Sequence, residues 1–384
     1  MGIKSRVMIE QSKLWSNFEM CTRDFKSLNI EQLENKEMYV SKVKHLDVDY
    51  IEPYMIYIIF VQLLEFEHGY KTIEKVMYEI PFQYQEHYCM FSMEKFGLKL
   101  IINTTDEGIL KTLFRKIKSA AKIAEKLLNP IIAESIDNGD ITIENQSGIL
   151  RQKYLYFRGR VEQIFSDNTD EKVREPKGLV GGLNSRIKLE KEIVFNTQAM
   201  LDAYFSFQEH LLILLLVFTN IDFKDERITI LMNSNWTEKF NKVFLPAKNP
   251  ELMKHFDTLK NLKEIRNKYA HGGFEKGEAS ILAHVRGVGA IPVELPSNNE
   301  ELFSFTLIKD INFKKICESI DAFENYLSKS DWSKAIKILE GGIDVRFDKG
   351  YITELKIAID SDENLESFLY KESYMYDQEA NMDW

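Results

Sequence analysis

EIVFNTQAMLDAYFSFQEHLLILLLVFTNI, at residues 192–221, is the stretch that decides the fold class. Its run LLILLLVF, at residues 211–218, is apolar around the whole circumference of a helix. Such a helix must be covered on more than one side. We therefore predict the central helix of a helical bundle, with part of this run forming a homodimer interface. A run of eight apolar residues is too short to cross a bilayer, so we expect no membrane association.

Helical patterns also dominate the flanking sequence. Residues 54–66 are strongly apolar and follow Pro53, which suits the first turn of a helix. Residues 106–136 form an amphipathic pattern behind capping candidates at residues 104–106. Its apolar face comprises Leu113, Ile117, Ala120, Ala124 and Leu128. Further helices are predicted at residues 236–244, 250–269, 311–327 and 332–339, and short strands or irregular structure at 277–308.

Two β-hairpins are expected where short alternating segments flank turn-forming residues. The first joins residues 141–144 to 150–157, and the second joins 344–347 to 352–359. Residues 166–186 are polar and rich in glycine, which is typical of a domain boundary. We predict a mainly α protein with three parts: a helical N-terminal domain (1–180), a helical bundle (185–340), and a hairpin with an acidic tail (341–384).

Composition excludes several classes of function. The three cysteines lie far apart without a C-x-x-C spacing, which is typical of a reduced, cytoplasmic protein. A net charge of −10 argues against a chain that coats nucleic acid with a basic surface. The histidines show no zinc-binding spacing, and no phosphate-binding or dinucleotide-binding glycine pattern is present. We therefore expect neither a metal nor a cofactor.

The most informative short motif is LKEIRNKYAHGG, at residues 262–273. It places Arg266 and His271 five residues apart, with polar Asn267 directly after the arginine. Five steps turn a helix by about 140° beyond a full turn, so the two side chains do not share one helix face. They converge if the helix ends between them, or if a second copy of the motif faces the first.

At this motif the chain resembles the HEPN superfamily (higher eukaryotes and prokaryotes nucleotide-binding domain), many of whose members are ribonucleases. The string RNKYAH matches the family signature of an arginine, a polar residue and a histidine after four to six residues. The segment FSFQEHLL, at 205–212, looks like the family's first core helix, and the likeness covers roughly residues 190–330. The resemblance implies a HEPN-like bundle that pairs as a homodimer and cuts RNA without metal. Some HEPN toxins carry a tyrosine where this chain has Gly273, so control by nucleotide attachment there is not supported.

The residue types fit this chemistry. RNA is cut without metal when its 2′-hydroxyl attacks the adjacent phosphate and the 5′-oxygen leaves. His271 can move protons near neutral pH, while Arg266 stays charged and can fork onto two phosphoryl oxygens. Asn267 could hold a phosphate or orient His271 through its amide. Glu209, among apolar neighbours on the preceding helix, is expected to pair with Arg266; the alternative is a carboxylate at the edge of the apolar face.

Basic residues indicate where RNA would dock. Lys268 lies inside the motif, and Lys111, Arg115, Lys118 and Lys122 form a row on one face of the helix predicted at 106–136. Such rows can follow an RNA backbone, although most charge rows are simply solvated surface. In the tail, residues 360–384 hold eight acids against one lysine, with five interleaved aromatic residues that could anchor it over a phosphate-binding cleft.

The sequence thus favours a metal-independent endoribonuclease, plausible as a toxin or antiphage defence effector, with RNA and a regulatory protein as partners. The competing interpretation is a catalytically inactive helical module that binds nucleic acid or protein. An open position for Arg266 and His271 would favour the enzyme, and a closed, buried salt bridge would oppose it.

Overall fold

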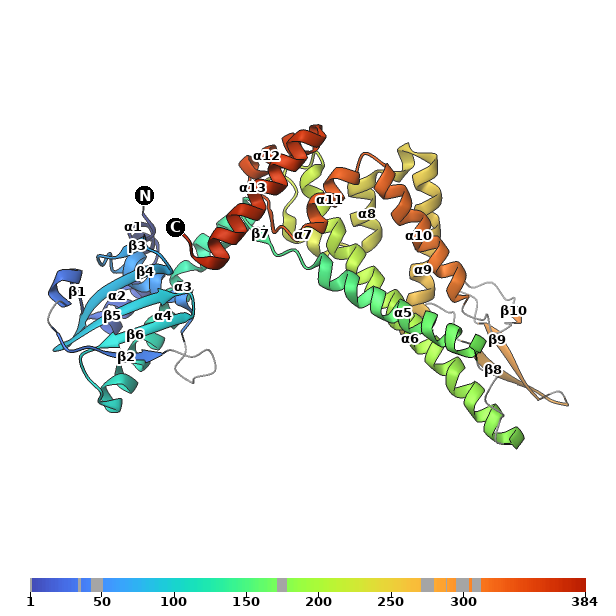
Figure 1. The fold of residues 1–384 in the computed structure, drawn as a ribbon, viewed down its shortest axis with the longest axis horizontal. Coiled ribbons are helices and arrows are strands. Elements are labelled where there is room, and N and C mark those ends of the chain that lie inside the picture. The colour runs from blue at the N-terminus through green and yellow to red at the C-terminus, as the bar shows by residue number, and fades with distance from the viewer. Residues whose placement is uncertain are drawn as a thin grey trace. The chain divides into compact units, whose positions relative to one another are not determined.

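The computed structural model describes residues 2–33, 36–42, 51–170, 178–270, 280–287, 289–294, 304–305 and 312–384 (Figure 1). The chain divides into two compact units. Unit 1 comprises Met1–Ile136 together with Tyr370–Trp384, and unit 2 comprises Asp137–Leu369. Helices dominate, so the predicted mainly α class is confirmed.

Unit 1 is built on a six-stranded antiparallel sheet, which the sequence analysis did not predict. The strand order is β1-β4-β5-β6-β2, with β3 also paired to β4. The bounds are β1 Phe25–Ser27, β2 Tyr39–Lys42, β3 Gly69–Ile73, β4 Val76–Tyr84, β5 His87–Glu94 and β6 Gly97–Ile102. The expectation of a helical N-terminal domain with a single β-hairpin is therefore wrong for this part of the chain.

The physical reason is that large apolar side chains are buried at every second position of β4 and β6. Ile80, Phe82 and Tyr84 are buried on β4, and Leu98, Leu100 and Ile102 are buried on β6. Alternate residues of a strand point to one side, so each strand contributes one apolar face to the core of unit 1.

Helices complete the core of unit 1. They are α1 Ile3–Glu10, α2 Ser12–Thr22, α3 Pro53–Tyr57 continued by the π-helix η2 Ile58–Leu63, and α4 Glu107–Asp137. The helices predicted at 54–66 and 106–136 are confirmed in position. The side chain of Asp106 caps α4 by accepting from the backbone N–H of Gly108 at 2.7 Å. The predicted apolar face of α4 is buried throughout: Leu113, Ile117, Ala120, Ala124 and Leu128.

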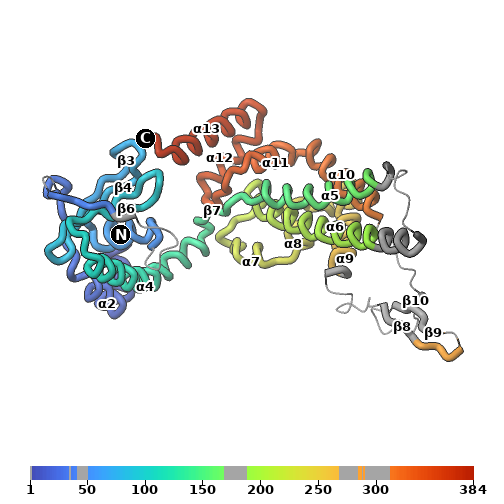
Figure 2. Tube along the Cα trace, turned by 60° about the horizontal axis from the view of Figure 1, so that its bottom comes forward, coloured from blue at the N-terminus to red at the C-terminus, as the bar shows by residue number. Residues whose placement is uncertain are grey.

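Unit 2 is a helical assembly around α5 Ser147–Asp170 and α6 Gly178–Leu215, which run alongside each other (Figures 1 and 2). The remaining helices are α7 Ile228–Asn233, α8 Trp236–Phe244, α9 Pro250–Ala270, α10 Phe313–Lys329, α11 Ser333–Glu340, α12 Lys349–Asp360 and α13 Asp362–Asn381. A 3-10 turn, η3 Leu216–Phe218, extends α6. The helices predicted at 236–244, 250–269, 311–327 and 332–339 are confirmed.

The apolar run on α6 is covered within a single chain. Every residue from Leu211 to Val217 is at most 6% exposed. The expectation that part of this run forms a homodimer interface is therefore wrong, because neighbouring helices of unit 2 already bury it. By length and composition Lys188–Phe218 could span a membrane, but 72% of its apolar 18-residue window is buried inside the protein.

Both predicted hairpins are also wrong, because residues taken for turns are helix caps. Residues 147–170 form α5, whose first turn is capped by the side chain of Asn145, an acceptor from Ser147 N at 3.0 Å. Asp348 caps α12 by accepting from Tyr351 N at 3.0 Å. The two short strands pair with each other instead, β7 Thr142–Ile143 with β11 Val345–Arg346. Strands β8 Ser280–Val285, β9 Gly289–Glu294 and β10 Ser304–Phe305 form a small antiparallel sheet.

The two units differ from the predicted domains 1–180, 185–340 and 341–384. The division falls at residues 136 and 137, near the end of α4, whereas the predicted boundary at 166–186 lies within unit 2 and partly outside the described residues. The predicted acidic tail is α13, which begins in unit 2 and ends in unit 1. Its Trp384 donates its indole N–H to the carbonyl oxygens of Val76 at 2.9 Å and Ile73 at 3.1 Å, so it is anchored on the β3–β4 turn of unit 1.

Candidate active site

The predicted motif lies at the end of α9. Arg266 and Asn267 are in the last turns of this helix, which ends at Ala270. His271 and the side chain of Lys268 lie outside the described residues. Of the predicted catalytic residues in this motif, the structure thus describes the side chains of Arg266 and Asn267.

Arg266 is held by a carboxylate of the central helix α6. Its Nε lies 2.5 Å from Oδ1 of Asp202, and its Nη1 donates to Oδ1 of Asn267 at 3.1 Å. The pair is open to solvent, with side-chain exposures of 30% for Arg266 and 49% for Asp202. The guanidinium is thus fixed by charge-assisted hydrogen bonds at an accessible surface and not sealed in a buried salt bridge. Asn267 contributes by orienting this arginine.

Glu209 does not pair with Arg266, so that expectation is wrong. Its two carboxylate oxygens lie 3.7 Å from the ammonium nitrogens of Lys239 and Lys263. The reason is helix geometry. Asp202 and Glu209 are two turns apart on one face of α6, and Lys263 and Arg266 are one turn apart on α9. Because α6 and α9 run antiparallel here, Asp202 pairs with Arg266. Glu209 pairs with Lys263.

The ion pairs form one cluster with a surplus of positive charge. It contains Lys239 of α8 and Lys263 and Arg266 of α9, against Asp202 and Glu209 of α6. Lys239 is only 6% exposed. Lys263 lies over the ring of Trp236, with its Nζ 5.4 Å from the ring centroid. Burial lowers the pKa of Lys263, an effect that Glu209 opposes.

His210 has a structural role beside this cluster. Its Nε2 accepts the backbone N–H of Gln146 at 3.0 Å, next to the first turn of α5. Burial lowers its pKa, which favours the neutral, accepting form.

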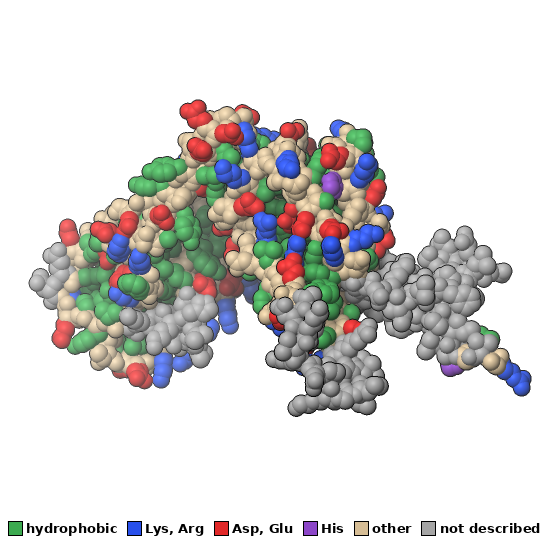
Figure 3. Space-filling model, turned by 45° about the vertical axis from the view of Figure 1, so that its right-hand side comes forward, with side chains coloured by type: hydrophobic (Ala, Val, Ile, Leu, Met, Phe, Trp, Pro, Cys, Tyr) green, Lys and Arg blue, Asp and Glu red, His purple; other side chains and the backbone are tan. Residues whose placement is uncertain are grey.

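The predicted cationic row is a feature of unit 1. Lys111, Arg115 and Lys122 are exposed on α4 and Lys118 is half-buried, opposite the buried apolar face of that helix. Lys111 lies 3.6 Å from the carboxylate of Glu107, one turn earlier. The row and Arg266 thus belong to different units. On the face drawn in Figure 3, acidic and basic side chains are interspersed over the described surface.

Sequence reasoning missed Asp202, Lys239 and Lys263. The spacing of seven residues between Asp202 and Glu209 was a usable signal, because it places two carboxylates on one helix face. What the sequence could not show is which helix packs against that face. In the part of the chain that the structure describes, no group of three or more histidine, cysteine or acidic residues could hold a metal ion.

Comparison with known proteins adds no relationship. No family model, no curated protein and no solved structure matches this chain.

Proposed function

We propose that this protein is a metal-independent endoribonuclease of the HEPN type. The observation that carries the proposal is the placement of Arg266 at an accessible surface, fixed by Asp202 and Asn267, five residues before His271. A fixed guanidinium that solvent can reach is suited to bind a phosphate group.

In the proposed reaction, His271 takes the proton from the RNA 2′-hydroxyl as the 2′-oxygen bonds to phosphorus. The bond from phosphorus to the 5′-oxygen breaks, and that oxygen receives a proton. Arg266 stabilises the negative charge that gathers on the phosphoryl oxygens. The products are a 2′,3′-cyclic phosphate and a 5′-hydroxyl. A second copy of the motif would supply the second proton-transfer group, so we propose a homodimer.

Regulation and biological role follow from the resemblance alone. We propose that the protein is a toxin or antiphage defence effector that acts in the cytoplasm. A regulatory protein partner would inhibit it. Lys268 and the α4 row of Lys111, Arg115, Lys118 and Lys122 are the proposed contacts to the RNA backbone.

The competing function is a catalytically inactive module that binds nucleic acid or protein. The ion pair between Arg266 and Asp202 taken alone also fits this function, because a purely structural arginine would make the same contact; the solvent accessibility of the pair is what favours the enzyme. The two functions differ in one respect only, namely whether RNA is cut.

The discriminating experiment is incubation of the purified protein with RNA in EDTA. His271→Ala and Arg266→Ala should each lower the cleavage rate by at least about a hundredfold, the usual scale for a positioned acid or base. Arg227→Ala is the matched control, because Arg227 makes a comparable exposed ion pair with Asp137 at 2.6 Å. Equal cleavage by wild type and both motif variants would reveal a contaminating nuclease and reject the proposal.

A further inference from the structure

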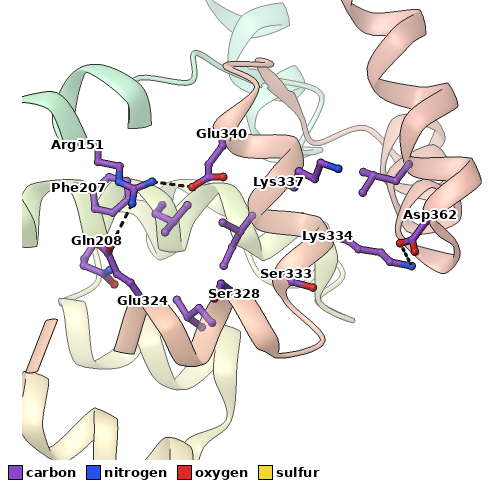
Figure 4. A pocket seen from close by; sticks show the side chains of 14 residues that line it. Arg151, Phe207, Gln208, Glu324, Ser328, Ser333, Lys334, Lys337, Glu340 and Asp362 are labelled. Carbon is purple, nitrogen blue, oxygen red and sulfur yellow. Dashed lines mark hydrogen bonds and ion pairs between the residues drawn. The ribbon is translucent and has the colours of Figure 1, made fainter. Parts of the chain in front are cut away.

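Unit 2 contains a cavity of about 410 Å³ that the proposed ribonuclease chemistry does not use. It lies between α5, α6, α10, α11 and the first residues of α13 (Figure 4). Its size falls within the range of roughly 300–1,000 Å³ that is usual for small-molecule sites. The chemistry of its lining changes from one end to the other.

One end has more acceptors than donors. Arg151 donates from Nη1 to Glu340 at 2.8 Å and from Nη2 to Glu324 at 3.2 Å, so one cation faces two carboxylates. Gln208 is 1% exposed and donates its Nε2 to the hydroxyl of Tyr204 at 3.2 Å. Its Oε1, like Oε1 of Glu324, accepts no hydrogen bond from the described residues, and Nε of Arg151 donates none, so two acceptors and one donor lack partners here. Buried acceptors without a donor are costly, so this end is suited to a group that brings N–H donors and positive charge.

The middle of the cavity is apolar. Its walls there consist of side chains from four helices, namely Phe207, Leu211, Leu327, Ile336 and Leu365. A ligand that fills this part gains free energy by removing apolar surface from water.

The opposite end has a surplus of positive charge. Lys334 is paired with Asp362 at 3.2 Å. Lys337, one turn later on α11, is exposed and makes no ion pair with the described residues. Figure 4 shows Lys334 and Asp362 away from Arg151, Gln208 and Glu324, across the cavity. This end is suited to an anionic group.

We propose that the cavity binds a small zwitterion with an apolar body, namely an apolar dipeptide, whose ammonium and carboxylate are held apart by the peptide unit. Its ammonium group lies against Gln208, Glu324 and Glu340, its two side chains fill the apolar middle, and its carboxylate faces Lys337. Charge complementarity at both ends fixes the orientation. Burial also raises the pKa of Glu324, and an adjacent ammonium would stabilise its ionised form.

The test is isothermal titration of the full chain with the dipeptides Leu-Leu, Leu-Phe and Phe-Leu. Each is compared with its N-acetyl form, which lacks the ammonium, and with its C-terminal amide, which lacks the carboxylate. We expect saturable binding of at least one free zwitterion, and binding weaker by about tenfold or more for both blocked forms. Absence of binding by every probe means that the cavity holds water only, and overturns the proposal. Equal binding of free and blocked forms, or a loss for one blocked form only, overturns it as well.

Two variants locate the site. Glu324→Gln keeps the shape of the side chain and removes the charge, and it should weaken binding of the free zwitterion on the order of tenfold. Lys337→Ala removes an exposed lysine and should weaken it about threefold, while leaving the C-terminal amide unaffected. Lys314→Ala is the control, because Lys314 is 87% exposed and does not line the cavity. Thermal unfolding checks that each variant is folded. Wild-type binding by both Glu324→Gln and Lys337→Ala would place the ligand elsewhere and reject the assignment. Binding is measured without RNA, so the result is independent of the proposed function.

Discussion

Two faces of the central helix α6 differ in how their polar side chains are partnered and exposed. On the face toward α9, Asp202 and Glu209 each meet cationic partners, at solvent-accessible positions. On the face toward α10 and α11, the amide of Gln208 is buried and its oxygen has no partner among the described residues. An exposed ion pair fixes the orientation of a side chain that can then act on a substrate. Buried acceptors without a hydrogen-bond donor are costly, and a ligand that supplies donors removes this cost. The following predictions test whether this distinction holds.

The largest expected effect concerns Asp202 as the positioning residue for Arg266. Asp202→Asn keeps the shape of the side chain but weakens its hold on the guanidinium. We expect RNA cleavage to fall by about tenfold, with an effect on the free energy of unfolding below about 1 kcal/mol, as for exposed ion pairs. Cleavage kinetics and urea unfolding measure the two quantities. Unchanged cleavage would show that the pair is only structural.

Glu209→Gln should have the opposite balance of effects from Asp202→Asn: a larger effect on the free energy of unfolding than on RNA cleavage. It leaves the buried ammonium of Lys239 without its carboxylate partner, so we expect the free energy of unfolding to fall by about 1–3 kcal/mol. Glu318→Gln, which alters an exposed pair with Lys314 at 4.0 Å, is the matched control. If both variants unfold at the same urea concentration, the cluster around Glu209 does not stabilise unit 2.

The cationic row of unit 1 should have a smaller effect on RNA. Changing Lys111, Arg115 and Lys122 together to glutamine should weaken RNA binding several-fold at low salt and reduce its salt dependence. Electrophoretic mobility shift at two salt concentrations measures this. A salt dependence equal to that of wild type would show that the row is solvated surface only.

The smallest effect is expected at Glu324, on the cavity face. Burial raises its pKa in the folded protein, so the wild-type protein loses stability as pH rises from the ordinary glutamate pKa through this raised value. Glu324→Gln removes this pH-dependent contribution to the stability of the folded protein. Its stability relative to wild type should therefore increase with pH across that window and be lowest in acid, as judged by thermal unfolding. A relative stability that falls as pH rises would contradict the assigned burial.

The sequence was most informative where local signals decide structure. The start of α8 at Trp236 was predicted correctly, and Asn235 caps it by accepting from Glu238 N at 3.0 Å. Local signals failed at Asn145 and Asp348, since the same residue types make hairpin turns and helix caps. The contacts that distinguish the two are distant in sequence: Asn145 Nδ2 donates to the carbonyl oxygen of Leu339 at 2.7 Å.

The candidate site was predictable in part for the same reason. Arg266 stands out through its spacing to His271, a property of the local sequence. Its partner Asp202 lies 64 residues away and is selected only by the packing of α9 on α6. The cavity was not predictable, because its walls come from helices that are far apart in the chain.

The most direct test of the central claim is identification of the ends of RNA fragments produced in EDTA by the wild-type protein. The account predicts 5′-hydroxyl ends and 2′,3′-cyclic phosphates or their opened products, and their loss in Arg266→Ala and His271→Ala. Fragments with 5′-phosphate and 3′-hydroxyl ends, or intact RNA with the folded wild-type protein, would contradict it.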